Sequence, residues 1–371
     1  MKYLKLVLVI ILLIPITGCY NYRELDDLGI TTAIGVTKEN NEYKLIIEVL
    51  RTEGESDEAT EPQYVLFETK GKTIQEALRN TILESSKRLY INHLSLLIID
   101  ETLAKEGIHD IMDLFFRDSE SRKQFYVLVS KVPINELLNT KTLLTNINSK
   151  SIFERMKTND DYLNNVVTIT FSKLLTKYVN PNKELVIPSI TLEENNITEE
   201  NEKRIILSDT AIFKDDKLIG YLNNDETLYY NLIEDEVDDT VISIEDNDKY
   251  SSVEMNFNNT IIDVNNKDIN IRIEMFGNIA EMNYDIDLTN PNSITYLEKL
   301  YENYLNIEIS KIIHKVINEY DTDIFGFKDL IYKNDFKNFN TNIKLKDLNI
   351  IVDTKISIKS KGNGVYKLNE R

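Results

Sequence analysis

In the first half of the chain, segments with the two-residue hydrophobic period of strands are followed by segments with the three-to-four-residue spacing of helices. Residues 28–36 alternate with a period of two, which predicts a strand. One face of this strand holds only glycine, alanine and threonine, so a helix or another strand can approach it closely. Apolar runs of strand length predict further strands at residues 43–51, 64–69, 94–99 and 124–130.

Helical spacing fills the stretches between these strands. Thr73 and Glu76 are spaced as a capping box, which predicts the start of a helix. A second helical stretch covers residues 101–117 with an interruption at Gly107, and further helical segments fill much of residues 134–178. We therefore expect residues 19–190 to form an N-terminal α/β domain with a mixed sheet.

The second half starts again with strands after a polar stretch. Residues 191–204 are mostly acidic and amide residues without periodicity, which indicates a linker. A hairpin and a short helix follow, and residues 253–276 hold two alternating runs that are typical of half-buried antiparallel strands. The expected elements are strands 205–213 and 217–222, helix 225–233, strands 253–261 and 269–276, and a last strand 350–358.

The longest predicted helix spans residues 294–320. Its apolar side chains keep a spacing of three and four for about seven turns, and charged or amide residues cover the other side. We interpret it as a core helix that lies across the sheet; the alternative is a partner-binding helix. The predicted fold class is α+β with several domains, in which residues 205–371 form antiparallel strands and this helix. A further boundary near residue 250 is an alternative.

The N-terminus predicts a secreted, lipid-modified protein. Lys2 and Lys5 precede the apolar run 6–14, Pro15 ends the run, and Cys19 follows a small residue. About ten apolar residues are too few to cross a bilayer, which needs roughly twenty. We therefore expect cleavage after residue 18 and acylation of Cys19, with an uncleaved N-terminal anchor as the alternative.

The acidic composition of the chain limits which partners it can bind. The formal charge is -19, which disfavours nucleic acid and leaves no basic patch for anionic lipid. On this basis the anchor holds the protein at the membrane alone. Cys19 is the only cysteine, so no disulfide within the chain is expected.

Catalytic and metal-binding patterns are missing from the sequence. There is no G-x-S-x-G, P-loop or H-E-x-x-H motif, and the three histidines are far apart. Residues 245–248 lack the glycine and the terminal glutamate of a calcium loop. Gly362 and Gly364 fall in a polar tail. We expect no enzyme activity, no metal and no cofactor.

Five segments, residues 19–35, 88–108, 116–129, 211–227 and 320–327, together resemble the GerAC-like lipoproteins, the C subunits of spore germinant receptors. The first runs from Cys19 through Arg23 and Glu24 to Gly35, with Tyr20 where the family often has tryptophan. The other four keep the family order over nearly the whole mature chain. They are residues 88–108, residues 116–129 with Arg117 and Arg122, residues 211–227, and residues 320–327.

The resemblance implies a non-catalytic subunit on the outer face of the cytoplasmic membrane, which in spores is the inner membrane. Such subunits join membrane-spanning A and B subunits in nutrient-triggered spore germination, and the family fold is α+β. The resemblance also makes four charged residues candidates for the partner interface: Arg23, Glu24, Arg117 and Arg122. The alternative is that they form internal salt bridges. Two other classes stay open: a solute-binding lipoprotein of a transporter, and a cell-envelope hydrolase.

Overall fold

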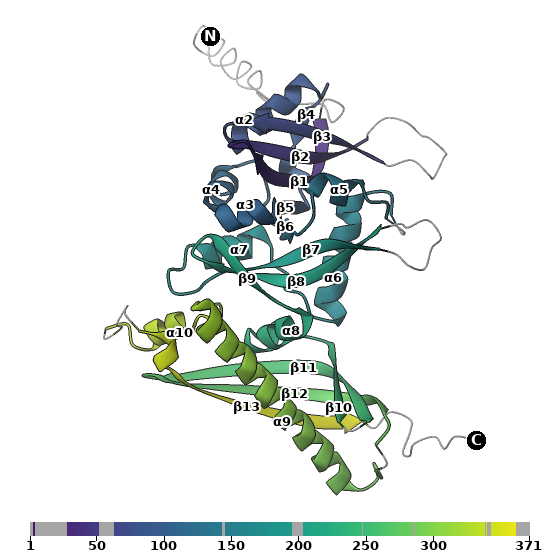
Figure 1. The fold of residues 1–371 in the computed structure, drawn as a ribbon, viewed down its shortest axis with the longest axis vertical. Coiled ribbons are helices and arrows are strands. Elements are labelled where there is room, and N and C mark those ends of the chain that lie inside the picture. The colour runs from purple at the N-terminus through teal and green to yellow at the C-terminus, as the bar shows by residue number, and fades with distance from the viewer. Residues whose placement is uncertain are drawn as a thin grey trace, which may run out of the picture.

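The computed structural model places two β-sheets at opposite ends of an elongated molecule, with helix α8 between them (Figure 1). The leader, Cys19, the acidic stretch 53–62 and the tail from residue 361 lie outside the described residues. The structure describes residues 3, 28–51, 63–142, 145–194, 203–246, 248–284, 286–337, 339 and 343–360.

The first sheet is mixed and has nine strands in the order β3-β2-β1-β5-β6-β7-β8-β9, with β4 paired to β1 off this path. Strands β1, β5, β6 and β7 run parallel to one another, and hairpins extend both edges. Its strands are β1 Leu28–Glu39, β2 Glu42–Leu50, β3 Tyr64–Gly71, β4 Arg88–Tyr90, β5 Leu96–Asp100, β6 Tyr126–Ser130, β7 Val186–Glu194, β8 Lys203–Lys214 and β9 Lys217–Leu222.

Helices cover both faces of this sheet, which is why its parallel strands are apolar throughout. Ala33 and Leu96 share an apolar cluster with Ile134 of α5 and Ile152 of α6, and the other face packs against α2, α3, α4 and α7. Gly35 explains the close fit, because a Cβ there would lie 2.3 Å from Cγ2 of Ile134. These elements are α2 Ile74–Asn80, η3 Thr81–Leu83, η4 Ile91–His93, α3 Glu101–Glu106, α4 His109–Arg117, α5 Ile134–Asn139, α6 Asn148–Tyr162 and α7 Phe171–Tyr178.

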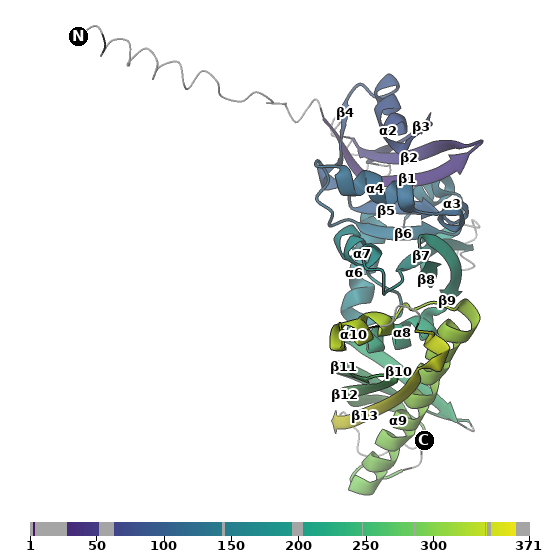
Figure 2. The ribbon, with the colours of Figure 1, turned by 90° about the vertical axis from the view of Figure 1, so that its left-hand side faces the viewer.

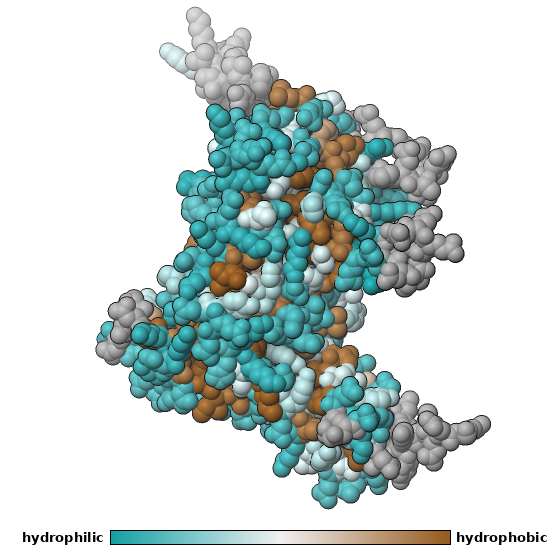
Figure 3. Space-filling model, viewed as in Figure 1, coloured by the Kyte–Doolittle hydropathy of each residue, from teal (hydrophilic) through white to brown (hydrophobic). Residues whose placement is uncertain are grey.

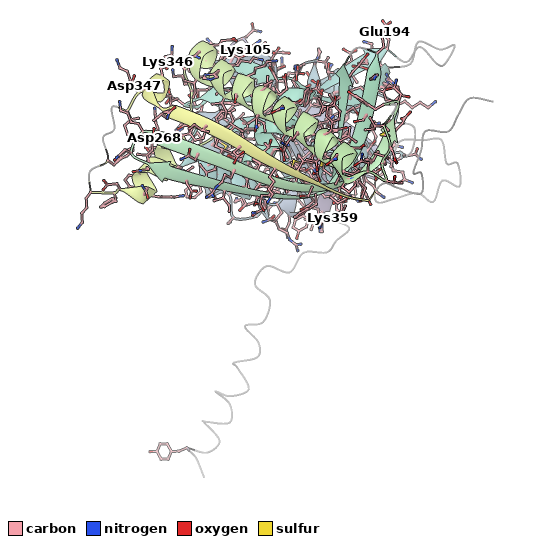
Figure 4. All side chains as sticks on the ribbon, turned by 90° about the horizontal axis from the view of Figure 1, so that it is seen from below. Lys105, Glu194, Asp268, Lys346, Asp347 and Lys359 are labelled. Atoms are coloured by element: carbon pink, nitrogen blue, oxygen red, sulfur yellow. The ribbon has the colours of Figure 1, made fainter. Side chains whose placement is uncertain are left out.

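The second sheet has four strands in the order β10-β11-β12-β13 and carries one long helix on one face (Figure 4). Viewed from below, α9 crosses the strands, and β13 runs from the end near Asp268 and Asp347 to Lys359. The elements are β10 Thr240–Asp246, β11 Lys249–Asn265, β12 Asp268–Met282, β13 Asn349–Ser360, α8 Asn224–Ile233, α9 Pro291–Lys315, a π-helical turn η5 Val316–Tyr320, α10 Phe327–Asn334 and η6 Leu345–Asp347.

The α+β fold class and the long packed helix are confirmed, and one detail is corrected. Strand β13 pairs parallel with β12, so the second sheet is mixed and not purely antiparallel. The reason is the connection: α9 carries the chain back along the sheet before β13 begins, as a parallel pair requires. Leu297, Tyr301 and Leu305 of α9 are buried, which agrees with a core helix.

The predicted linker is shorter in the structure. Residues 191–194 and 203–204 are strand residues, and Glu194 pairs with Lys203 at the end of the β7–β8 ribbon. This end of the ribbon projects beyond the core, so its side chains are exposed and show no hydrophobic period. Strands β8 and β9 join the first sheet. The domain division at residues 19–190 and 205–371 stays a prediction.

Candidate partner interface

Two of the family-like segments line one groove on the first sheet. The groove runs beside β4 between α2 and α4, and we call it the β4 groove. Its floor is apolar, while Arg79, Arg88, Asp118 and Glu120 are charged residues of its lining. Arg88 pairs with Glu120 at 2.5 Å. The lining residues are Gln75, Leu78, Arg79, Ile82, Arg88, Leu89, Ile91, Leu114, Phe115, Asp118 and Glu120.

The sequence-predicted interface residues divide into two groups. Arg117 is 73% exposed, and its Nε–H is shared between the two carboxylate oxygens of Asp113 on the same helix, with Nε–O distances of 2.8 and 2.9 Å. An exposed pair of this kind stabilises a helix only slightly, so the fold does not need it. Arg122 is exposed and has no hydrogen bond or ion pair with any described residue. Cys19, Arg23 and Glu24 fall outside the described residues, and the interface role of all four charges stays a prediction.

Three family-like segments, residues 88–108, 211–227 and 320–327, meet at a junction between the two sheets. The turn between β8 and β9 lies against the start of α4. The N-cap residue of α4, Ile108, has no side chain that can cap the helix, and Asp216 of the turn provides the hydrogen-bond acceptors instead. The Ile108 N–H donates to the Asp216 carbonyl oxygen at 3.0 Å, and the His109 N–H donates to its carboxylate at 3.3 Å. Free N–H groups at a helix start favour such a carboxylate. Gly107 leaves room for it, since a Cβ there would lie 2.6 Å from Oδ2 of Asp216.

The segment 320–327 closes the same junction from the side of the second sheet. Lys214 pairs with Asp321 at 3.0 Å, and the hydroxyl of Thr322 donates to the Phe213 carbonyl oxygen. Asp323 is buried and accepts hydrogen bonds from the N–H groups at the start of α10, at 3.0 and 2.8 Å. Burial raises the pKa of Asp323, and these hydrogen bonds oppose the shift. The segment therefore fixes the position of α10 and of the first sheet together.

A half-buried ionic cluster completes the junction. Glu234, at the end of α8, binds Lys183 at 2.5 Å and Lys177 at 3.3 Å. Burial lowers the pKa of Lys177, and the charge of Glu234 opposes that shift. Across the junction, Gly220 allows the ring of Tyr320 to lie flat on β9, because a Cβ there would be 2.2 Å from the ring. Three of the family-like segments thus have a structural role at this contact.

The described residues give no support for a metal-dependent catalytic site. No group of three or more His, Cys, Asp and Glu side chains in that part of the chain is placed to hold a metal ion. The most buried carboxylate, Glu48, accepts hydrogen bonds from the hydroxyls of Thr32 and Ser149 and from the Ser149 N–H. It caps the start of α6 and lines none of the grooves described above. A hydrolase therefore gains no support here.

Glu48 makes stability depend on pH. Burial raises the pKa of Glu48, although hydrogen bonds from Ser149 and Thr32 oppose the shift. The folded state therefore binds the proton more tightly than the unfolded state, and stability is lost as pH rises through the raised pKa. Between the ordinary glutamate range and neutral pH, we expect the native chain to lose stability relative to Glu48→Gln. Urea unfolding followed by circular dichroism measures this difference, and parallel curves for the two chains would contradict it.

The described part of the chain also lacks the architecture that is expected of a solute-binding protein. Such a protein has two similar lobes around a cleft, whereas the two sheets here have nine and four strands in different orders. Among the described helices, none is long and apolar enough to cross a membrane.

The two halves of the chain match two family models in order. The spore germination protein N-terminal domain matches residues 21–192, and the spore germination B3/GerAC-like C-terminal domain matches residues 208–362. The chain belongs to the GerAC-like family of spore germination proteins, which confirms the resemblance seen in the sequence. This is a family of germinant-receptor C subunits and not a known enzyme family.

Named relatives extend over most of the chain. Spore germination protein KC of Bacillus subtilis is 26% identical over 360 residues, which cover 90% of this chain and 88% of that protein. Spore germination protein B3 of the same organism is 22% identical and GerQC of Bacillus cereus is 20% identical. Their matches cover 86% of this chain and 86% of B3, and 87% of this chain and 89% of GerQC. The crystal structure of the GerBC protein is similar in fold, with a TM-score of 0.53 at 16% identity, over 88% of this chain and 96% of that one.

Sequence reasoning missed the junction as a contact. Asp216 and Glu234 carry no local pattern that marks them as partners, because the side chain of each acts on an element distant in the chain. One signal was present: Gly107, Gly220 and Gly326 all lie inside family-like segments, and each meets a side chain of another element.

Proposed function

We propose that this chain is the lipid-anchored, non-catalytic C subunit of a spore germinant receptor. It works in nutrient-triggered germination by assembly and signalling with membrane-spanning A and B subunits. The observation that carries the proposal is the match of both family domains, in order, behind a leader that ends at Cys19.

The proposed place of action is the outer face of the cytoplasmic membrane. The apolar run before Cys19 supports it, since a leader of that length directs secretion and does not cross the bilayer as a stable span. A diacylated cysteine would supply the two chains that stable anchoring requires. The acidic body then lies outside the membrane, beside its partners.

Tethering explains how weak contacts are sufficient. A subunit held in the same bilayer as its partners meets them at a high effective concentration, so modest interfaces become occupied. Arg117 and Arg122 support such an interface because both are exposed and neither stabilises the core. They lie on and just after α4, beside the β4 groove.

Deletion and complementation in the organism that encodes the chain test this function. Spores that lack the chain are expected to germinate slowly or not at all towards at least one nutrient, with normal vegetative growth. Dipicolinate release and the fall in optical density measure the effect. The native gene restores germination, whereas Cys19→Ala leaves the membrane fraction and does not restore it.

A further arm tests the interface. Arg122→Glu is expected to fold and to reach the membrane, yet to recover less of the A and B subunits in copurification. Lys299→Glu, an equal change of charge on an exposed position of α9, is the matched control. Normal germination of the deletion strain towards every nutrient, in a background without related genes, would refute the proposed function.

A further inference from the structure

The end of the molecule nearest the N-terminus carries exposed apolar side chains on a short turn. Helix η3 joins α2 to β4, and we call residues 81–87 the η3 turn. Leu83 is 85% exposed and Ile82 is 52% exposed. The turn forms the upper end of the described molecule in Figures 1 and 2, and Figure 3 shows hydrophobic surface there.

The fold does not require apolar residues at these two positions. Thr81 is buried, and its carbonyl oxygen accepts hydrogen bonds from the N–H groups of Glu84 and Ser85 at 3.1 and 2.8 Å. The Ser85 hydroxyl donates to the Lys87 carbonyl oxygen and accepts from the Lys87 N–H. Hydrogen bonds of Thr81 and Ser85 thus stabilise the turn, while the side chains of Ile82 and Leu83 are exposed. Contact of these two side chains with an apolar environment would be favourable.

Charge at this end differs from the charge of the whole chain. Residues 63–93 hold five basic and three acidic side chains, whereas the chain as a whole has a formal charge of -19. Two of the five basic side chains pair with acidic residues outside this stretch, Lys70 with Glu39 and Arg88 with Glu120. Arg79 is exposed and has no partner among the described residues. A turn with apolar side chains among basic residues is the pattern of an interfacial membrane contact. The residues counted are Lys70, Lys72, Arg79, Lys87 and Arg88 against Glu68, Glu76 and Glu84.

The length of chain outside the described structure places this end near lipid. Leu28 is the strand partner of Arg88, which follows the η3 turn directly. Leu28 follows Cys19 by only nine positions. A chain of that length reaches about 30 Å when fully extended. An anchor on Cys19 therefore holds the η3 turn, and not the second sheet, close to the bilayer.

We propose that the η3 turn is a second membrane contact, in which Ile82 and Leu83 enter the boundary between headgroups and acyl chains of an anionic bilayer. Arg79 and Lys87 lie at the level of the lipid phosphates. The proposal rests on the anchoring at Cys19 that the proposed function includes. It replaces the expectation that the anchor acts alone, because the charge of the whole chain conceals a basic end. Two attachments also fix the orientation of the molecule on the membrane.

The absence of tryptophan makes a direct test available. A Leu83→Trp chain contains one tryptophan, which reports lipid contact through its emission. The chain that begins at Cys19 is coupled through its only cysteine to a maleimide lipid in vesicles of phosphatidylglycerol and phosphatidylcholine. This coupling does not depend on acylation in the cell. Ile351→Trp on β13, where the native side chain is 52% exposed, is the matched control.

The expected emission of Leu83→Trp on vesicles is shifted to the blue and quenched by brominated acyl chains, whereas Ile351→Trp shows neither effect. Replacing both Ile82 and Leu83 with serine in the uncoupled Cys19→Ala chain should weaken vesicle binding at least about a hundredfold, since each fully buried aliphatic side chain contributes about tenfold or more. Coupled chains with an unquenched Leu83→Trp would overturn the proposal and favour a protein partner at the turn. Failure of acylation in the cell would affect only the proposed function.

Discussion

Glu234→Gln is expected to destabilise the chain more than any other single change of charge at the junction. The glutamine cannot neutralise Lys183 and Lys177, whose side chains are only 17% and 24% exposed. Removing one partner from such a cluster leaves charge in a poorly solvated place, at a cost of about 3 kcal/mol. Urea unfolding followed by circular dichroism measures the free energy of unfolding.

Glu236→Gln is the matched control, two residues further along the chain. Its partner is Lys173 at 3.1 Å, and both side chains are more than half exposed. A pair of this kind contributes about 0.5 kcal/mol or less. Equal losses for the two variants would contradict the importance of burial at Glu234.

Gly107→Ala is the second change with a large expected effect. Gly107 has a φ of 140° and a ψ of 147°, a conformation that residues with a Cβ rarely adopt. The added Cβ would also displace the carboxylate of Asp216 from the start of α4. Backbone strain and overpacking together are expected to lower the free energy of unfolding by about 3 kcal/mol.

Asp216→Ala separates the two causes of this loss. Without the carboxylate, the Cβ at position 107 has space, and only the backbone strain persists. The penalty of Gly107→Ala should then fall by about 1 kcal/mol in the Asp216→Ala chain. An identical penalty in both backgrounds would rule out the steric part, and a penalty near zero would rule out the strain.

Local patterns in the sequence were sufficient for most elements and failed where pairing is distant. The alternation in residues 28–36 predicted β1 and the close approach of a helix or another strand to its small-residue face, and the structure places Ile134 of α5 there. Thr73 does accept from the Glu76 N–H, as predicted, but the Glu76 carboxylate accepts from Lys72 and not from Thr73. Strands β7 and β10 were missed, because their ends are polar and their pairing is set by strands elsewhere in the chain.

The candidate site shows the same division. The sequence indicated which segments belong together in a family, and it identified Arg117 and Arg122 as exposed charges of those segments. It did not reveal that the segments at residues 107, 216 and 323 touch, because a contact between distant segments has no periodicity. The basic end around the η3 turn was hidden for a different reason: a net charge averages over the whole chain.

The central position of β1 has a mechanical consequence. β1 follows Cys19 by nine residues and pairs with β2 on one side and with β4 and β5 on the other. A force applied at Cys19 would therefore be shared by hydrogen bonds on both sides of the strand. An edge strand can separate from its sheet one hydrogen bond at a time. Strand β1 can move only if its hydrogen bonds to the strands on both sides break together. If Cys19 is anchored as proposed, movement in the membrane would pull on the middle of the first sheet without unravelling it.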